Sequence, residues 1–115
     1  MSARPLALIV EDSDDQTALL RRHLTREGYD AFTASDAESA IAAFDGIDPA
    51  IAVVDLILPG MSGQECARRI RERFPHCFVI ISSVLNPEDY PPADAALPKP
   101  ITGARLHDAL GRISA

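Results

Sequence analysis

A run of four apolar residues, 51–54, leads directly into Asp55, and a Pro59-Gly60 pair follows within five residues. An apolar run of this length that is rich in β-branched residues is typical of a strand covered on both faces, as in a parallel sheet. The Pro-Gly pair predicts a turn directly beyond the strand. A carboxylate is costly to bury without partners, so an aspartate at the end of such a strand indicates a functional site.

Further apolar runs of strand length lie at residues 6–10 and 78–81, with a half-polar run at 30–34 and a weaker run at 95–97. Between these runs apolar residues recur with the period of a helix. The predicted helices cover residues 15–27, 36–44, 62–74 and 102–113, the second of them capped by Ser35 or Asp36. Such alternation predicts an α/β fold with a doubly wound, five-stranded parallel sheet of the flavodoxin-like kind, strand order 2-1-3-4-5.

The length and composition of the chain favour a single domain over residues 1–115. Apolar residues make up 47% and charged residues 24% of the chain, as in ordinary globular domains. No apolar stretch has the length of a membrane span and no leader precedes the first strand, so we expect a cytoplasmic protein without a membrane partner. The net charge of −6 argues against direct binding to nucleic acid. Cys66 and Cys77 match no metal or disulfide spacing and are expected to be buried thiols.

Lys99 is the only lysine among eleven basic residues, and it lies between Pro98 and Pro100. A lysine held in this way can act as a positioned point charge, whereas the other ten basic residues are all arginine. A compositional preference for arginine is the competing interpretation. The lysine alone does not decide between the two.

Polar side chains follow four of the predicted strands at the edge where ligands bind in such sheets. They are Glu11 and Asp12 after the first strand, Asp55 after the third, Ser82 and Ser83 after the fourth, and Lys99 after the fifth. Three carboxylates repel one another unless a cation is present, and a site with oxygen ligands only favours Mg²⁺. A divalent cation, a lysine and a hydroxyl around one carboxylate suit phosphoryl transfer to that carboxylate. Each residue also has a structural interpretation, since the serines could simply end a strand and Asp55 could cap the next helix.

In these features the sequence resembles the receiver domains of two-component response regulators along essentially its whole length. The motifs that carry the resemblance are residues 8–12, residues 53–63, the hydroxyl after residues 78–81, and Lys99-Pro100. The resemblance implies that Asp55 accepts a phosphoryl group from a histidine kinase or a histidine phosphotransfer protein. Phosphorylation would then switch contacts with a downstream protein, and the only catalysis would be the domain's own phosphorylation and dephosphorylation.

The resemblance also implies a role for the residues around Asp55. Mg²⁺ would be bound by Asp12, Asp55 and the backbone carbonyl of Ile57, with Glu11 acting through water. Lys99 would pair with the phosphoryl oxygens, and the Lys99–Pro100 bond is expected to be cis.

The hydroxyl position is ambiguous in this chain. An ungapped alignment from Asp55 places the hydroxyl at Ser83, and a shift of one residue places it at Ser82. In the Ser83 register the next residue is Val84, which we expect to slow exchange with small phosphodonors.

The segment that carries the fourth helix in the family is also unusual. Residues 84–98 are shorter than usual and contain four prolines, which predicts a short or absent helix. Ala96 stands where a switching aromatic is common, and Tyr90 is either its substitute or a surface anchor. The competing functional hypothesis is therefore a degenerate receiver that binds a protein independently of phosphorylation. The chain is expected to be either a stand-alone receiver or one excised from a longer protein.

Overall fold

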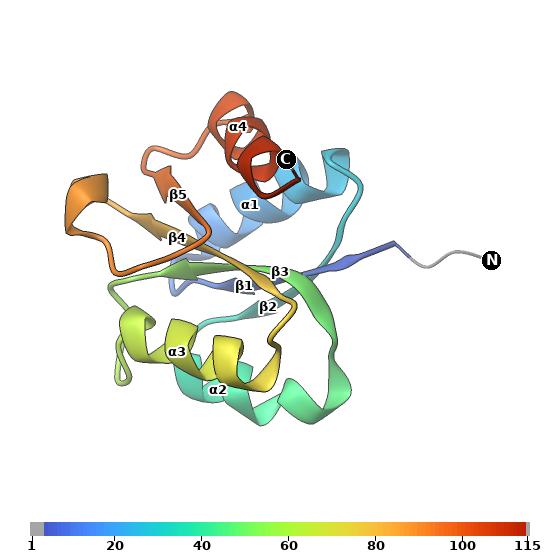
Figure 1. The fold of residues 1–115 in the computed structure, drawn as a ribbon, viewed down its shortest axis with the longest axis vertical. Coiled ribbons are helices and arrows are strands. Elements are labelled where there is room, and N and C mark those ends of the chain that lie inside the picture. The colour runs from blue at the N-terminus through green and yellow to red at the C-terminus, as the bar shows by residue number, and fades with distance from the viewer. Residues whose placement is uncertain (1–3, 115) are drawn as a thin grey trace.

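The computed structural model describes residues 4–114, which form one parallel sheet covered by helices on both faces (Figure 1). The strands lie in the order β2-β1-β3-β4-β5, and every neighbouring pair is parallel. Their bounds are β1 (Leu6–Val10), β2 (Asp30–Ala34), β3 (Pro49–Asp55), β4 (Phe78–Ser83) and β5 (Ala95–Pro98). The flavodoxin-like sheet and the strand order predicted from the sequence are confirmed.

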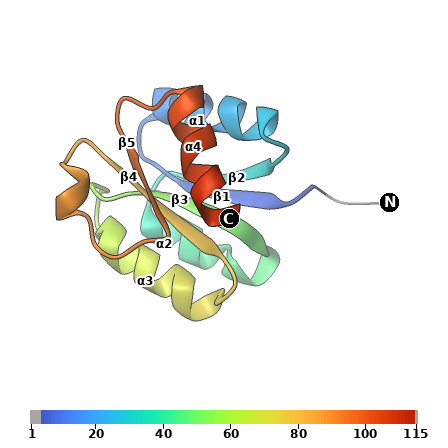
Figure 2. The ribbon, with the colours of Figure 1, turned by 45° about the horizontal axis from the view of Figure 1, so that its top comes forward.

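Within residues 4–114, three α-helices connect strands and a fourth follows β5, so that two helices lie on each face of the sheet. They are α1 (Asp14–Arg26), α2 (Ala37–Ala42), α3 (Gly63–Arg73) and α4 (Gly103–Ser114). Figures 1 and 2 show α1 and α4 together on one face and α2 and α3 on the other. None of the helices within residues 4–114 is long and apolar enough to cross a membrane.

Side-chain oxygens fix where all four of these helices begin. Ser13, Asp36, Ser62 and Thr102 each accept a hydrogen bond from the backbone N–H three residues further on. The cap of α2 is therefore Asp36 and not Ser35. This helix ends at Ala42, earlier than predicted, and a 3₁₀ turn η1 (Phe44–Gly46) follows it. Asp45 and Gly46 favour a turn, which accounts for the early end of the α-helix. Phe44 keeps its predicted place in the core although it belongs to the 3₁₀ turn.

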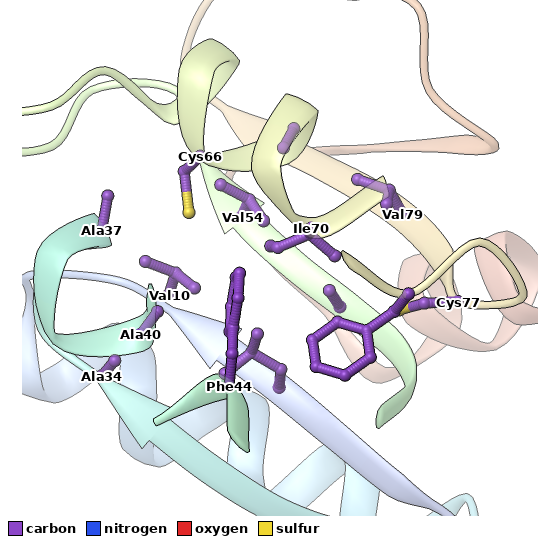
Figure 3. Packing of buried hydrophobic residues seen from close by; sticks show 14 of the residues in the cluster. Val10, Ala34, Ala37, Ala40, Phe44, Val54, Cys66, Ile70, Cys77 and Val79 are labelled. Atoms are coloured by element: carbon purple, nitrogen blue, oxygen red, sulfur yellow. The ribbon is translucent and has the colours of Figure 1, made fainter. Parts of the chain in front are cut away.

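Alternate residues of each strand contribute to two separate cores. Toward α2 and α3, Val54 of β3 packs with Phe44, Cys66 and Ile70, as Figure 3 shows. Toward α1 and α4, Val53 of the same strand belongs to a second cluster built on those two helices. Both cysteines are buried free thiols, as predicted, and burial raises the pKa of each to about 12.

The chain between β4 and β5 forms only a 3₁₀ turn, η2 (Pro87–Asp89), so the fourth helix of the family pattern is absent as an α-helix. Tyr90 and Ala93 from this segment pack against the core on the α3 side. The Tyr90 hydroxyl donates to the Ser83 carbonyl at 2.9 Å, and the Asp94 carboxylate accepts from the Val79 N–H at 2.7 Å. The short or absent helix predicted from the proline content is confirmed, and a few anchored side chains hold the segment against the rest of the fold.

Candidate functional site

Three of the predicted site residues meet at the carboxyl ends of β1, β3 and β5. The Lys99 ammonium lies 2.8 Å from Glu11 Oε1 and 2.9 Å from Asp55 Oδ2, so it bridges the two carboxylates. Glu11 and Asp55 are only 3% and 6% exposed. Two nearly buried carboxylates that share one ammonium form a partly compensated charge cluster. The carboxyl ends of parallel strands bring these side chains together.

Burial and charge shift the proton equilibria of this cluster. Burial raises the pKa of Glu11, the hydrogen bond from Lys99 partly offsets the rise, and the nearby charge of Asp55 adds to it. For Lys99, burial works against the charged form, but its hydrogen bonds to both carboxylates raise its pKa. The ammonium form of Lys99 is therefore favoured while it bridges the two carboxylates.

The backbone after β3 holds the Asp55 side chain in place. The Ile57 N–H donates to Asp55 Oδ1 at 3.1 Å, while Lys99 contacts the other oxygen. The Leu56 N–H donates to the Ser82 carbonyl at 3.3 Å and its carbonyl accepts from the Gly63 N–H at 3.1 Å. Each carboxylate oxygen therefore has a fixed partner, and the chain leaves the strand along a defined path toward α3.

Three acidic side chains at the site form a group suited to a metal ion. Glu11, Asp12 and Asp55 each offer an oxygen atom, and these oxygens lie within 4.8 Å of one another. Asp12 is exposed, whereas the other two are buried, so the group opens toward solvent on the Asp12 side. Hard divalent cations prefer such an all-oxygen set, and Mg²⁺ keeps several waters, which the open side can supply. The residues present therefore fit Mg²⁺.

The two serines at the end of β4 have different environments. Ser82 pairs in register with Asp55 on one side and with Leu97 on the other. Its hydroxyl is buried and has no hydrogen-bond partner among residues 4–114, whereas the Ser83 hydroxyl accepts from the Leu85 N–H at 3.2 Å. Because side chains alternate along a strand, Ser82 points to the same face as Asp55 and Ser83 to the opposite face. The orphaned hydroxyl is thus the one beside the acidic cluster. Val84 lies beyond the strand and is 72% exposed.

One residue near the site had no signal in the sequence. Glu38, in the first turn of α2, accepts a hydrogen bond from the Met61 N–H at 3.1 Å and thereby contacts the segment that follows Asp55. An exposed acidic residue on an amphipathic helix looks like any other surface residue in the sequence. Joint variation of Glu38 and the Gly60-Met61 turn among related sequences is the signal that could have revealed this contact.

Known proteins share these features. A model of the response regulator receiver domain matches residues 7–111. The transcriptional regulatory protein TcrA of Mycobacterium tuberculosis is 49% identical over 67 residues, which cover 57% of this chain and 26% of TcrA. The chain therefore spans about a quarter of the length of this curated relative.

Two solved structures extend the similarity to almost the whole chain. The response regulator TrrA of Thermotoga maritima, solved in complex with Mg²⁺ and BeF, is 26% identical with a TM-score of 0.84, covering 95% of this chain and 98% of TrrA. The chemotaxis response regulator CheY4 of Vibrio cholerae has the same fold, with 23% identity, a TM-score of 0.86 and coverage of 96% and 99%. The acidic cluster at the strand ends and the match over residues 7–111 lead to one conclusion: the chain belongs to the response regulator receiver domain family, the phosphoacceptor domains of two-component signalling.

Proposed function

We propose that Asp55 is the phosphoacceptor and that the donor is the phosphohistidine of a histidine kinase or histidine phosphotransfer protein. The observation that carries the proposal is the position of the Lys99 ammonium, 2.9 Å from Asp55 Oδ2 within a nearly buried carboxylate cluster. Phosphorylation of a single receiver domain over residues 1–115 then alters its contacts with a downstream protein. The only catalysis in this proposal is the domain's own phosphorylation and dephosphorylation.

The transfer follows from the placement of the residues. A carboxylate oxygen of Asp55 attacks the phosphorus, a P–O bond forms as the P–N bond breaks, and the donor imidazole nitrogen keeps the bonding electron pair. Lys99 balances the negative charge of the phosphoryl oxygens. Asp12, Asp55 and the Ile57 carbonyl would hold Mg²⁺, with Glu11 acting through water, and the bound ion would neutralise further negative charge. The Ile57 N–H fixes the Asp55 carboxylate in one orientation before the donor arrives.

Ser82 is the hydroxyl that we assign to the phosphoryl group, in preference to Ser83. Its support is the buried, unpaired hydroxyl on the face of β4 that Asp55 shares in register. A buried hydroxyl without a partner is unfavourable, and a phosphoryl oxygen at Asp55 would provide the missing acceptor. In this register the residue after the hydroxyl is Ser83, and Val84 lies one position further along.

Substitution of each serine by alanine distinguishes the two registers. Ser82→Ala is expected to slow phosphorylation by acetyl phosphate about 10-fold or more, because a hydrogen bond to a charged oxygen contributes about 1.5–3 kcal/mol. Ser83→Ala removes only the bond from the Leu85 N–H and is expected to stay within about twofold of the wild type. The rates can be measured by mass spectrometry of the intact protein. The reverse pattern would assign the role to Ser83.

The competing function, a degenerate receiver that binds a protein without phosphorylation, is favoured by the missing fourth helix. Beryllofluoride, which mimics the phosphoryl group, distinguishes it from a phosphorylatable switch. We expect Mg²⁺-dependent binding of beryllofluoride, visible as amide shifts at Ile57 and Ser82 in nuclear magnetic resonance spectra. A fluorine spectrum with no bound resonance at millimolar beryllofluoride and saturating Mg²⁺ would favour the degenerate receiver.

A further inference from the structure

The segment of residues 56–62 joins β3 to α3 and carries Ile57, whose carbonyl belongs to the proposed metal site. Its two ends are fixed close to the sheet, by the Ile57 N–H bond to Asp55 Oδ1 and by the Gly63 N–H bond to the Leu56 carbonyl. The middle of the segment turns at Gly60, where φ is +74°. The side chains of Leu56, Leu58 and Met61 in this segment pack against the core on the side of α2 and α3.

Glu38 on α2 adds a hydrogen bond to the backbone of this turn. Its Oε2 accepts a hydrogen bond from the Met61 N–H at 3.1 Å. Among the described residues, this is the only bond to the backbone of residues 56–62 from a side chain more than three residues away in sequence. The bond is charge-assisted, because a carboxylate accepts from a backbone amide, and such bonds are stronger than neutral ones.

The glycine next to Met61 allows this close approach. A Cβ atom built on Gly60 would lie 2.7 Å from Glu38 Oε2, closer than real Cβ contacts. The positive φ of the turn favours glycine at this position, and a Cβ there would displace the flexible end of the Glu38 side chain from its place beside the turn. The Glu38 carboxylate therefore contacts both the Met61 N–H and the space beside Gly60, although Glu38 and Gly60 are 22 residues apart in the sequence.

We propose that Glu38 is a positioning residue for the phosphoacceptor site. It holds the backbone of residues 56–62, which includes the proposed Ile57 carbonyl ligand, in one conformation, and so it strengthens Mg²⁺ binding without contacting the ion. Glu38 lies outside the group formed by Glu11, Asp12 and Asp55, so its effect must pass through the backbone. The inference rests on the proposed function, in which the Ile57 carbonyl is a metal ligand.

Two substitutions of Glu38 separate positioning from charge. Glu38→Gln removes the negative charge but keeps an oxygen that can accept from the Met61 N–H, whereas Glu38→Ala removes both. We expect Glu38→Ala to weaken Mg²⁺ binding about 3- to 10-fold, and Glu38→Gln to stay within about twofold of the wild type. The affinity can be measured by titrating Mg²⁺ and following the Ile57 amide resonance. Without Mg²⁺, Glu38→Ala should also speed hydrogen exchange at the Met61 N–H, and Glu38→Gln should not.

A second substitution tests the fit at the turn. Gly60→Ala is expected to weaken Mg²⁺ binding less in the Glu38→Ala background than in the wild type, because the carboxylate that its Cβ would meet has been removed. Additive effects would contradict the proposed contact. Equal weakening by Glu38→Gln and Glu38→Ala would show a pure charge effect and overturn the positioning role.

The two proposals fail in different ways. If the wild type binds Mg²⁺ and Glu38→Ala binds it equally well, the positioning role is overturned and the proposed function stands. If the wild type binds no Mg²⁺ at millimolar concentration, the metal site in the proposed function is overturned, and the role of Glu38 with it.

Discussion

Replacement of Asp55 by asparagine is expected to abolish phosphoryl transfer to the domain. The carboxamide has the same shape and can still accept a hydrogen bond from the Ile57 N–H, but its oxygen is a poor nucleophile and carries no charge. The wild type should take up radiolabel from a phosphorylated histidine kinase, whereas the label on the Asp55→Asn protein should stay at background. The measurement is the label retained by the protein after separation from the donor.

The result depends on a variant that folds. Lys99 keeps its contact with Glu11 in Asp55→Asn, so one charged pair of the cluster remains, and circular dichroism should show an intact fold. Asp36→Asn is the matched control: it makes the same chemical change at the cap of α2, where asparagine is as good a cap as aspartate, and should label like the wild type. Full labelling of Asp55→Asn would place the phosphoacceptor at another residue.

The sequence predicted the sheet well because its strands carry strong and simple signals. The run of residues 51–54 is too short and too rich in β-branched residues for a helix, and the polar residue at its end marks the edge where ligands bind. Parallel strands share one carboxyl edge, so Glu11, Asp55 and Lys99 had to lie near one another once the topology was known. The short turn at η2 followed from proline chemistry alone.

The features that the sequence left open depend on register and on distant contacts. Ser82 and Ser83 are adjacent and chemically identical, and a shift of one residue exchanges the two faces of β4. Only the pairing of Ser82 with Asp55 decides which hydroxyl lies beside the acidic cluster. The bond from the Met61 N–H to Glu38 joins two elements through a single exposed carboxylate, and no local pattern predicts such a contact.

Gly63→Ala is the substitution that we expect to damage the fold most. A Cβ atom on Gly63 would lie 2.0 Å from the Asp55 carbonyl oxygen and 2.6 Å from Leu56 Cα. Both are backbone atoms at the end of a central strand, so no side-chain rotation can relieve the overlap. Either β3 or the first turn of α3 must move, and the Gly63 N–H bond to the Leu56 carbonyl is lost with that movement. We expect the free energy of unfolding to fall by about 3 kcal/mol or more, measured by urea denaturation followed by circular dichroism.

Gly111→Ala is the matched control, since it makes the same change within a helix where, apart from the adjoining residues and the helix's own backbone, no atom lies within 4 Å of the new Cβ. There the better helix propensity of alanine should raise the free energy of unfolding by up to about 1 kcal/mol. Because the atoms displaced by Gly63→Ala include the carbonyl group of Asp55, any folded fraction of that variant should also accept phosphoryl groups more slowly than the wild type. A Gly63→Ala protein as stable as Gly111→Ala would mean that β3 and α3 do not approach as closely as the structure has them. The packing of the α3 N-terminus against the Asp55 carbonyl thus links the stability of the fold to the orientation of the proposed phosphoacceptor.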